Sequence, residues 1–410
     1  MALPKAAACK ECGTDPVHHR LTYITVALDE TLRPIFAPGP FMRFIGKGVY
    51  ALERVVSPRL LQLFVKLGWA KAVAAPDDDT MLLAKMLWEE AGKRGIEVRE
   101  IRLGGLARNL FLAKYPDGRV IAYEGIPLPP SGLAQAPWMD NKAEMKRRFR
   151  TLGIPVAAGG AAFTEHGARS VFQKVVPPVI VKPYSGSASR HTNLHITNEL
   201  KLFRAFHSAK KVAPLALIEE ELVGPVFRAT VVDGKFAAAL RRDPPHVIGD
   251  GMHTVEQLIE EANKNPQREG PYFSKMQITA ETLLELKWQN LTPESIPEKG
   301  RRVTLHQKVN WSLGGTTADV TDEVHADNVA LFEQVAHVLK APIVGMDVII
   351  GDMSRSWRDQ ERCGIIECNS MPFFDNHHLP FEGKPRNVAG LIWDMVEPKN
   401  KQRAGETEGV

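Results

Sequence analysis

Cysteine is scarce in this chain, which has four among its 410 residues: Cys9, Cys12, Cys363 and Cys368. A disulfide-stabilised secreted fold needs a much denser set of cysteines. Long apolar runs are also missing, because charged residues interrupt the hydrophobic N-terminal region before it reaches the roughly 18 apolar residues that cross a bilayer. The chain opens without a secretory leader pattern. These absences predict a cytoplasmic protein that does not span a membrane.

A strong excess of one charge is lacking as well. The 52 basic and 48 acidic residues give a formal net charge of +4. DNA-binding proteins usually carry a dense basic stripe, so we expect no nucleic-acid partner, whereas a slight positive excess favours small anions such as nucleotides. What the chain does have is the 44% hydrophobic and 24% charged content of an ordinary globular protein, at a length sufficient for two or three lobes.

Apolar residues recur with both helical and strand periodicity, which predicts a mixed α/β (α+β) fold. Helices are expected at 81–93, 142–152, from Thr197, from Thr254 and at 327–340. Strands are expected at 96–103, 109–115, 120–123, 179–182, 227–232, 235–240, 343–350 and 363–368. The Asp233-Gly234 pair predicts a type I′ hairpin turn, and Thr254 with Gln257 has the spacing of a capping box. The aspartates at 77–79 are expected at the first helix start, where negative charge is favourable.

Breaks in these patterns divide the chain into five segments. An irregular, basic N-terminal segment covers residues 1–75 and an α/β domain covers 76–140. Two lobes follow, at 141–225 and 226–397, and a polar tail covers 398–410. The helix at 142–152 is expected to form the hinge into the first lobe.

Two carboxylates stand inside apolar strands near the C-terminal end. Asp347 lies in the run 344–350 and Glu367 in 364–369, where a carboxylate is costly unless it faces a cation or a donor. Glu367 and Asn369 share one strand face, because alternate side chains point the same way. If the two strands pair, these three residues form an all-oxygen set that suits Mg²⁺ on nucleotide phosphates. The alternative is that each acid forms an ion pair with a lysine or arginine.

Several motifs, in this order, resemble the ATP-grasp ligases, which include D-alanine:D-alanine ligase. They are Val181-Lys182-Pro183 before a Ser/Gly loop, Glu219-Glu220-Glu221-Leu222, and Glu367-Cys368-Asn369-Ser370-Met371-Pro372. Three further segments, 241–251, 310–322 and 382–388, most resemble the ATP-grasp module of cyanophycin synthetase. The resemblance covers about residues 140–396, and several motifs in order are more specific than any single one.

This resemblance implies the ATP-grasp fold, in which two α/β lobes clasp the nucleotide, here preceded by an N-terminal α/β domain. It implies an ADP-forming carboxylate-amine ligase that makes an amide or peptide bond through an acyl phosphate, with ATP and Mg²⁺ as cofactors and Mn²⁺ able to substitute. The expected substrates are amino acids or a short peptide, and we expect a homo-oligomer. Cyanophycin synthetase continues into a Mur-ligase-like domain, and because no segment here matches that domain we expect a single ligation.

For the nucleotide, the resemblance implies two lysines, a small-residue loop and a hinge. The loop N–H groups would cover phosphate oxygens, and the hinge would hold the adenine edge. Glu219 or Glu221 would bind the ribose, because Val226 stands where the family usually has a ribose-binding glutamate. Lys142 can also be interpreted as a solvated helix start. The residues implied are Lys142, Lys182, Ser185, Gly186, Ser187, Glu219, Glu220, Glu221 and Leu222.

The catalytic set implied by the resemblance is Arg228, His306, Lys308 and Asn310. Arg228 would face the acyl substrate or phosphate, and its alternative is an exposed strand cation. His306 departs from the family, which has an arginine near this position to stabilise the γ-phosphate. Lys308, on the same strand face, can replace the charge but not the bidentate guanidinium. An alternative function is therefore a nucleotide-binding scaffold or regulatory protein with weak or no turnover.

Two N-terminal features lie outside this resemblance. Cys9, Cys12, His18 and His19 offer four zinc-competent side chains, but only the cysteine pair has a familiar zinc spacing. The basic run 43–71 can lie on an anionic membrane surface or pack against the catalytic lobes, and packing is the favoured interpretation.

Overall fold

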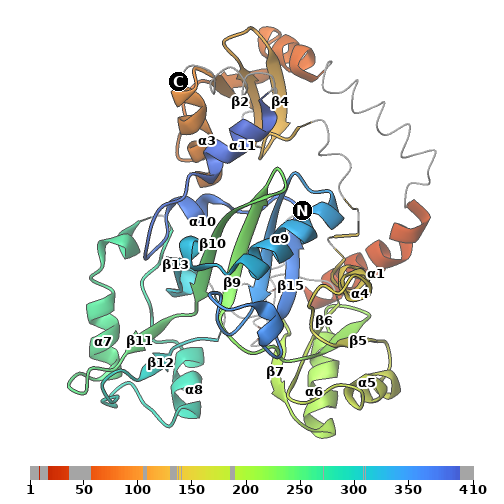
Figure 1. Ribbon diagram of the computed structural model, residues 1–410, viewed down its shortest axis with the longest axis vertical. Helices are drawn as coiled ribbons and strands as arrows, with labels where there is room; N and C mark the ends of the chain where they lie inside the picture. Colours follow the sequence, from red (N-terminus) through yellow and green to blue (C-terminus); the bar gives the residue numbers. More distant parts are fainter. Residues whose placement is uncertain are drawn as a thin grey trace.

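The computed structural model describes residues 9, 17–36, 57–104, 109–129, 136, 138–139, 141–184, 190–270, 272–307, 309 and 311–397. Outside this set lie residues 43–56 of the basic run, Cys12, and the predicted site residues Ser185, Gly186, Ser187, Lys308 and Asn310. The described residues form an N-terminal lobe, two larger lobes and a small lobe (Figure 1). No helix among them is long and apolar enough to cross a membrane.

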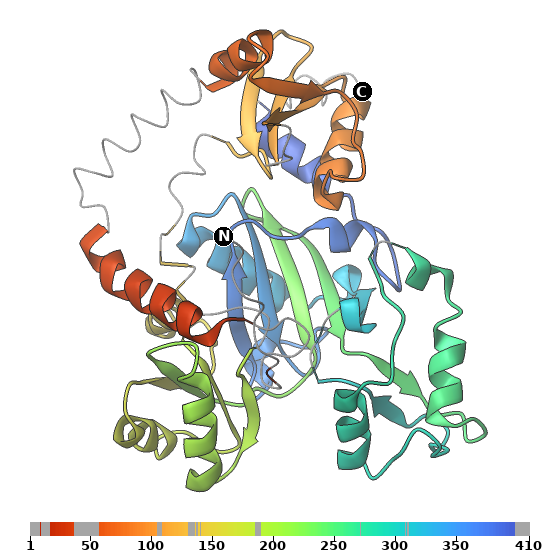
Figure 2. The ribbon, with the colours of Figure 1, turned by 180° about the vertical axis from the view of Figure 1, so that it is seen from behind.

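The N-terminal lobe is an antiparallel sheet covered by helices from both ends of the chain (Figures 1 and 2). Its strands, in spatial order, are β1 (Ala70–Val73), β2 (Glu97–Leu103), β3 (Leu110–Lys114) and β4 (Val120–Glu124). Helices α3 (Leu82–Lys93) and α11 (Val388–Val396) cover one face. The buried Trp393 indole of α11 donates a hydrogen bond to the Leu87 carbonyl oxygen of α3, at 2.9 Å. A helix over 57–66 contributes Leu61 to the core on the other face.

The N-terminal lobe therefore draws on residues beyond the predicted segment 76–140. Strand β1 begins at Ala70 and pairs along β2. Helix α11 lies within the segment 226–397, yet its apolar side chains pack with α3, because Ile392 and Trp393 complete the same hydrophobic core as Leu87.

Two helix starts differ from the prediction. The N-cap of α3 is Met81, which makes no side-chain cap hydrogen bond, and its first turn has no acidic residue. Asp77 instead pairs with Arg102 at 2.7 Å, because a guanidinium binds a carboxylate more strongly than a helix end does, and this contact lowers the pKa of Asp77. Asn198, rather than Thr197, caps α6 by accepting a hydrogen bond from the Lys201 amide at 3.0 Å.

The first lobe has strand order β5-β8-β6-β7. Its elements are β5 (Gly159–Ala162), α5 (Glu165–Phe172), β6 (Val179–Pro183), β7 (Asn193–Ile196), α6 (Glu199–Ala209) and β8 (Ala216–Glu220). Helix α4 (Lys142–Thr151) precedes them, and its Met145 and Phe149 pack in the core of the five-stranded sheet described next. Val179 and Val181 of β6 are buried in one core with Leu202 of α6. Because strand side chains alternate, Lys182 lies on the opposite face of the sheet, which it shares with Glu219 of β8.

The second lobe is a five-stranded antiparallel sheet in the order β13-β10-β9-β14-β15. Its elements are β9 (Val226–Val232), β10 (Lys235–Asp243), β13 (Thr316–Asp319), α9 (Ala326–Leu339), β14 (Ile343–Ile349) and β15 (Gly364–Asn369). Helix α9 covers one face, where its Leu331, Phe332 and Val335 are buried in one core with alternate residues of the strands. The predicted α9 stripe is confirmed. Strands β14 and β15 do pair, which is the condition set for Asp347, Glu367 and Asn369 to come together. The predicted hairpin turn is also confirmed, with positive φ at Asp233 and Gly234.

A small lobe is inserted between β10 and β13 (Figure 1). Its elements are β11 (His246–Ile248), α7 (Val255–Ala262), η3 (Pro266–Glu269), α8 (Ala280–Trp288) and β12 (Arg302–Thr304). The predicted capping box is present, because the side chains of Thr254 and Gln257 each accept a backbone hydrogen bond. Short turns elsewhere are η4 (Trp311–Leu313), η5 (Thr321–Glu323), η6 (Trp357–Asp359) and α10 (Asp375–His378).

Candidate active site

The polar face of the second-lobe sheet carries a row of charged side chains across three strands. Arg228 of β9 is paired in register with Asp347 of β14, and Asp347 with Glu367 of β15. Directly opposed residues share a sheet face, so these three side chains lie side by side opposite the core that α9 covers. Asn369 lies two residues from Glu367 on that face, opposite Gly345. The structure thus brings together four predicted site residues.

Asp347 is buried between two arginines. Its Oδ1 accepts from Arg228 Nε at 2.7 Å, and its Oδ2 from Arg242 Nη1 at 3.1 Å. Asp347 therefore forms the ion pairs that the sequence indicated as the alternative to binding a metal. Glu367 is different, with a side chain 38% exposed and an Oε2 that lies 3.7 Å from Lys142 Nζ. Of the two acids, Glu367 is the more accessible to a bound ion.

Gly345 provides the space that the Arg228 side chain occupies. A Cβ at residue 345 would lie 2.7 Å from Arg228 Nη1 and 2.7 Å from Pro372 Cβ. Both distances are well inside van der Waals contact, so a larger residue would displace the guanidinium or the proline. The guanidinium that contacts Asp347 therefore depends on a glycine two residues away in the same strand.

A second charged group lies on the first lobe, where Glu219 is held between two lysines. Lys146 Nζ donates to both Glu219 oxygens, at 2.6 and 2.7 Å, and Lys182 Nζ lies 2.8 Å from Glu219 Oε2. The side chains of Lys146 and Glu219 are each only 2% exposed. Burial, followed by the charge of Lys182, lowers the pKa of Lys146 to about 7. Burial opposes ionisation of Glu219, but the two lysines lower its pKa to about 2.

The other two acids of the predicted hinge point elsewhere. Glu220 Oε1 accepts from the Ala158 amide at 2.7 Å, which ties β8 to the start of β5. Glu221 Oε1 lies 2.8 Å from His195 Nδ1, and its side chain is partly exposed. Because both lysines engage Glu219, Glu221 is the more accessible of the two acids considered for the ribose, and Leu222 follows it at the lobe boundary.

Buried polar groups behind Arg228 extend the site. His377 Nε2 lies 2.8 Å from Thr230 Oγ1, on the same strand face as Arg228. Burial, with the charge of Arg228, lowers the pKa of His377 to about 3, which keeps its ring neutral. Burial raises the pKa of Asp375 to about 6. The Arg242 guanidinium lies over the Trp311 ring, 5.1 Å from its centre.

His306 belongs to the small lobe and is buried there. Its Nε2 lies 2.7 Å from Glu281 Oε2 of α8. His306, which replaces the family arginine, is therefore paired with Glu281 of α8. The guanidinium groups next to Asp347 come from Arg228 and Arg242.

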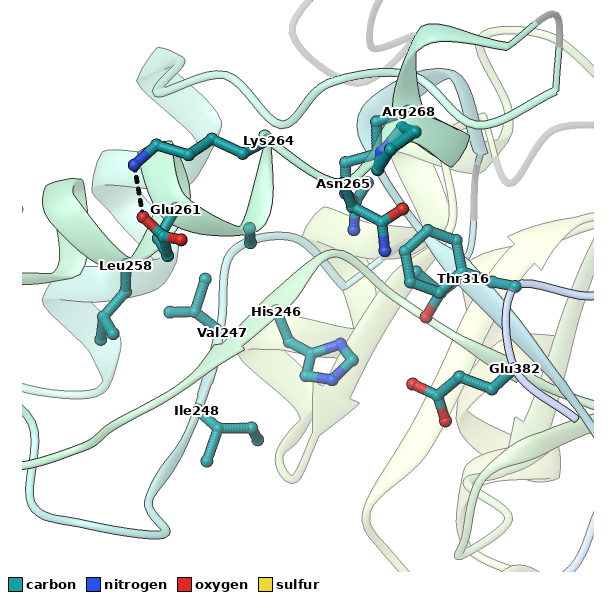
Figure 3. Close-up of a pocket in the computed structure, with 13 residues that line it drawn as sticks. His246, Val247, Ile248, Leu258, Glu261, Lys264, Asn265, Arg268, Thr316 and Glu382 are labelled. Carbon is teal, nitrogen blue, oxygen red and sulfur yellow. Dashed lines mark hydrogen bonds and ion pairs between the residues drawn. The ribbon is translucent and has the colours of Figure 1, made fainter.

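A cavity of about 670 Å³ lies between the small lobe and the edge strand β13 (Figure 3). His246 and Glu382 extend toward each other there, and Lys264 and Arg268 also line the cavity, with the Lys264 ammonium directed at Glu261. Burial lowers the pKa of His246, and the hydrogen bond between its Nδ1 and the Pro244 carbonyl oxygen partly opposes this. Thr316, which borders the cavity, is opposed to Asp243 in the β10–β13 register, so the cavity adjoins the sheet face opposite Arg242.

Sequence reasoning missed several of these residues. Lys146, His377, Asp375 and Trp311 were not predicted. Lys146 offered one signal, because it follows Lys142 by one helical turn and so shares its helix face. For His377 and Asp375 the sequence gives no such spacing, since they come from a short helix placed by tertiary contacts.

Two α/β lobes with lysines on one and carboxylates on the other define an ATP-grasp architecture. A crystal structure of a bifunctional glutathione synthetase from Pasteurella multocida matches 78% of this chain and 44% of that one, with a TM-score of 0.58 and 24% identity. Cyanophycin synthetase from a Nostoc species is 34% identical over 265 residues, which are 64% of this chain and 29% of that protein. The chain therefore has the ATP-grasp fold and is similar in sequence to part of cyanophycin synthetase.

A bifunctional protein of glutathione biosynthesis from Listeria innocua is 28% identical over 327 residues, which are 78% of this chain and 42% of that protein. The chain thus spans less than half the length of these curated relatives. No family model matches it.

Proposed function

We propose that this chain is an ADP-forming ligase that joins the carboxylate of an amino acid or short peptide to an amine. One observation carries the proposal: Lys142 Nζ lies 3.7 Å from Glu367 Oε2. The resemblance gives Lys142 to the nucleotide and Glu367 to the metal, and these two groups come from α4 and from β15 of the five-stranded sheet. A triphosphate between them would meet lysines on one side and carboxylates on the other.

Each charged group then has a part in holding ATP. Lys142 and Lys182 pair with phosphate oxygens, and Glu219 orients Lys182 through their 2.8 Å contact. Asp347, Glu367 and Asn369 offer the oxygen ligands that Mg²⁺ prefers. When bound, Mg²⁺ would neutralise charge on the phosphates. Glu221 is the candidate for the ribose hydroxyl groups.

The chemistry needs positioning and charge more than covalent help from the protein. The substrate carboxylate oxygen attacks the γ-phosphorus, the bond to the β–γ bridging oxygen breaks, and ADP leaves. The amine nitrogen then attacks the acyl carbon, loses a proton to solvent and expels phosphate, which leaves the amide. Arg228 and Arg242 flank this face and stabilise the negative charge that develops on the transferring phosphoryl group and on the tetrahedral carbon.

Phosphate release by the purified chain with ATP, Mg²⁺ and pooled amino acids or dipeptides tests the proposal. We expect release only when an acceptor pair is present. Glu367→Gln should lower kcat about 100-fold or more, the scale of losing one electrostatic stabiliser. Glu361→Gln is the matched control, because that carboxylate is exposed in the loop joining β14 and β15. The proposal is refuted if turnover and nucleotide affinity are unchanged both when Mg²⁺ is chelated and in the double variant Asp347→Asn, Glu367→Gln.

A second candidate function is a nucleotide-binding scaffold without turnover. It is supported by His306, which stands near the family arginine position and is paired with Glu281. The same assay separates the two functions: a scaffold would be thermally stabilised by ATP and Mg²⁺ but would release no phosphate with any acceptor pair.

A further inference from the structure

Three metal-competent side chains from distant parts of the sequence converge beside the first lobe. Cys9, His19 of α1 (His19–Phe36) and His191 each offer a ligand atom, and these atoms lie within 4.8 Å of one another. His191 Nε2 is 3.3 Å from His19 Nε2 and 4.0 Å from Cys9 Sγ. The sequence had marked Cys9 and His19, but His191 lies about 170 residues further on, and only the fold brings it to them.

The spacing of the two histidine nitrogens matches the geometry of a tetrahedral zinc centre, and the cysteine sulfur lies nearby. Zinc lies about 2.05 Å from histidine nitrogen and about 2.3 Å from cysteine sulfur. At a tetrahedral angle, two bound nitrogens are then about 3.3 Å apart, and a nitrogen and a sulfur about 3.6 Å apart. The observed nitrogen separation equals the first value. The Cys9 sulfur lies 4.0 Å from His191 Nε2 and up to 4.8 Å from the His19 ligand atom, so it has to move inward by about an ångström to complete the set.

His191 is held as zinc ligands usually are. Its ring is buried, and its Nδ1 lies 3.3 Å from Ser208 Oγ of α6. A hydrogen bond at one ring nitrogen fixes the orientation of the ring and directs the other nitrogen at the metal. Here that other nitrogen, Nε2, faces both Cys9 and His19.

We propose that Cys9, His19 and His191 bind a zinc ion that fastens the N-terminal segment to the first lobe. One thiolate and two imidazoles form a borderline-soft set that favours zinc over Mg²⁺. Helix α1 lies against the lobe that contains α5 and α6 (Figure 2). His191 follows the small-residue loop 185–189 by two residues, so the ion would anchor one end of the segment that the resemblance places over the phosphates.

Metal analysis of the full chain, purified without chelator, tests this directly. We expect about one zinc per chain, and on replacement with Co²⁺ a thiolate-to-cobalt charge-transfer band that Cys9→Ser abolishes. Ser208→Ala should weaken zinc binding about 10- to 100-fold, measured by competition with a chromophoric chelator, because it removes the hydrogen bond to Nδ1. Zinc removal should also lower the Tm of the intact chain.

A change at the buried His191 could prevent folding. His19→Gln then keeps the proposal testable, because His19 is only half-buried at the start of α1. The matched control is His207→Gln on α6, an exposed histidine next to Ser208, which should leave zinc content unchanged. A correctly folded chain that binds no zinc would overturn the proposal, and so would zinc that survives both Cys9→Ser and His19→Gln. Either result would mean that His19 and His191 form only a hydrogen bond with each other and hold no metal ion.

Discussion

Lys142 and Lys146 lie one turn apart on α4, yet their ammonium groups reach acids in different lobes. Lys142 Nζ is 3.7 Å from Glu367 of the five-stranded sheet, and Lys146 Nζ is 2.6 Å from Glu219 of the four-stranded one. A single helix thus connects the two charged groups of the candidate site. Any change in the tilt of α4 alters both contacts together.

Glu219→Gln is predicted to destabilise the first lobe. The change leaves Lys146 and Lys182 close together without the carboxylate that compensates them, and breaking a buried ion pair typically costs about 3–5 kcal/mol. Urea unfolding measures the loss. Glu199→Gln removes the exposed pair with Arg169 and should change stability by less than about 1 kcal/mol. Equal losses of unfolding free energy in the two variants would show that the buried ion pairs of Glu219 stabilise the chain no more than an exposed pair does.

Gly345→Ala should impair both packing and turnover. The new Cβ would meet Arg228 Nη1 and Pro372 Cβ, so we expect a loss of about 1–3 kcal/mol in the free energy of unfolding and a displaced guanidinium. Gly92→Ala in α3 is the control, because no atom lies within 4 Å of its added Cβ and alanine favours a helix. A Gly345→Ala variant as active and stable as the native chain would contradict the close packing of Arg228.

The free energy of unfolding should fall as pH is lowered through the range from about 6.5 to 3. Burial lowers the pKa of His377 to about 3, so between these values the unfolded chain binds a proton that the folded chain does not. Uptake of this one proton makes the free energy of unfolding rise by up to about 1.4 kcal/mol for each pH unit between these two values. His378, with a pKa of about 4, acts in the same direction, while Asp375, raised to about 6, acts in the opposite one below pH 6.

His377→Gln separates these contributions, because glutamine cannot take up a proton in this range. We expect a shallower dependence of unfolding free energy on pH in the variant than in the native chain, measured by chemical unfolding at a series of pH values. An unchanged slope would mean that His377 titrates at its ordinary pKa.

Trp393→Ala should destabilise the N-terminal lobe although residue 393 lies near the other end of the chain. The indole is fully buried between α11 and α3, and removal of a buried tryptophan costs about 3–5 kcal/mol. Trp288→Ala on α8 is the matched control, because that side chain is 63% exposed and its loss should cost less than about 0.5 kcal/mol. Hydrogen exchange in β2 and β3 would show whether the loss is local to this lobe.

The sequence by itself determined many of the elements and the chemical identity of much of the site. Periodicity gave the α9 stripe and the paired strands β14 and β15, because one buried face imposes a repeat that can be read locally. Motif order gave Lys142, Lys182 and the carboxylates. Tertiary structure alone decided which groups meet: Asp347 with two arginines, Glu219 with Lys146, and His191 with Cys9 and His19. Such pairs are distant in sequence, and they form because the folded core buries these groups together, where a charged group without a partner would be costly; no local pattern records this.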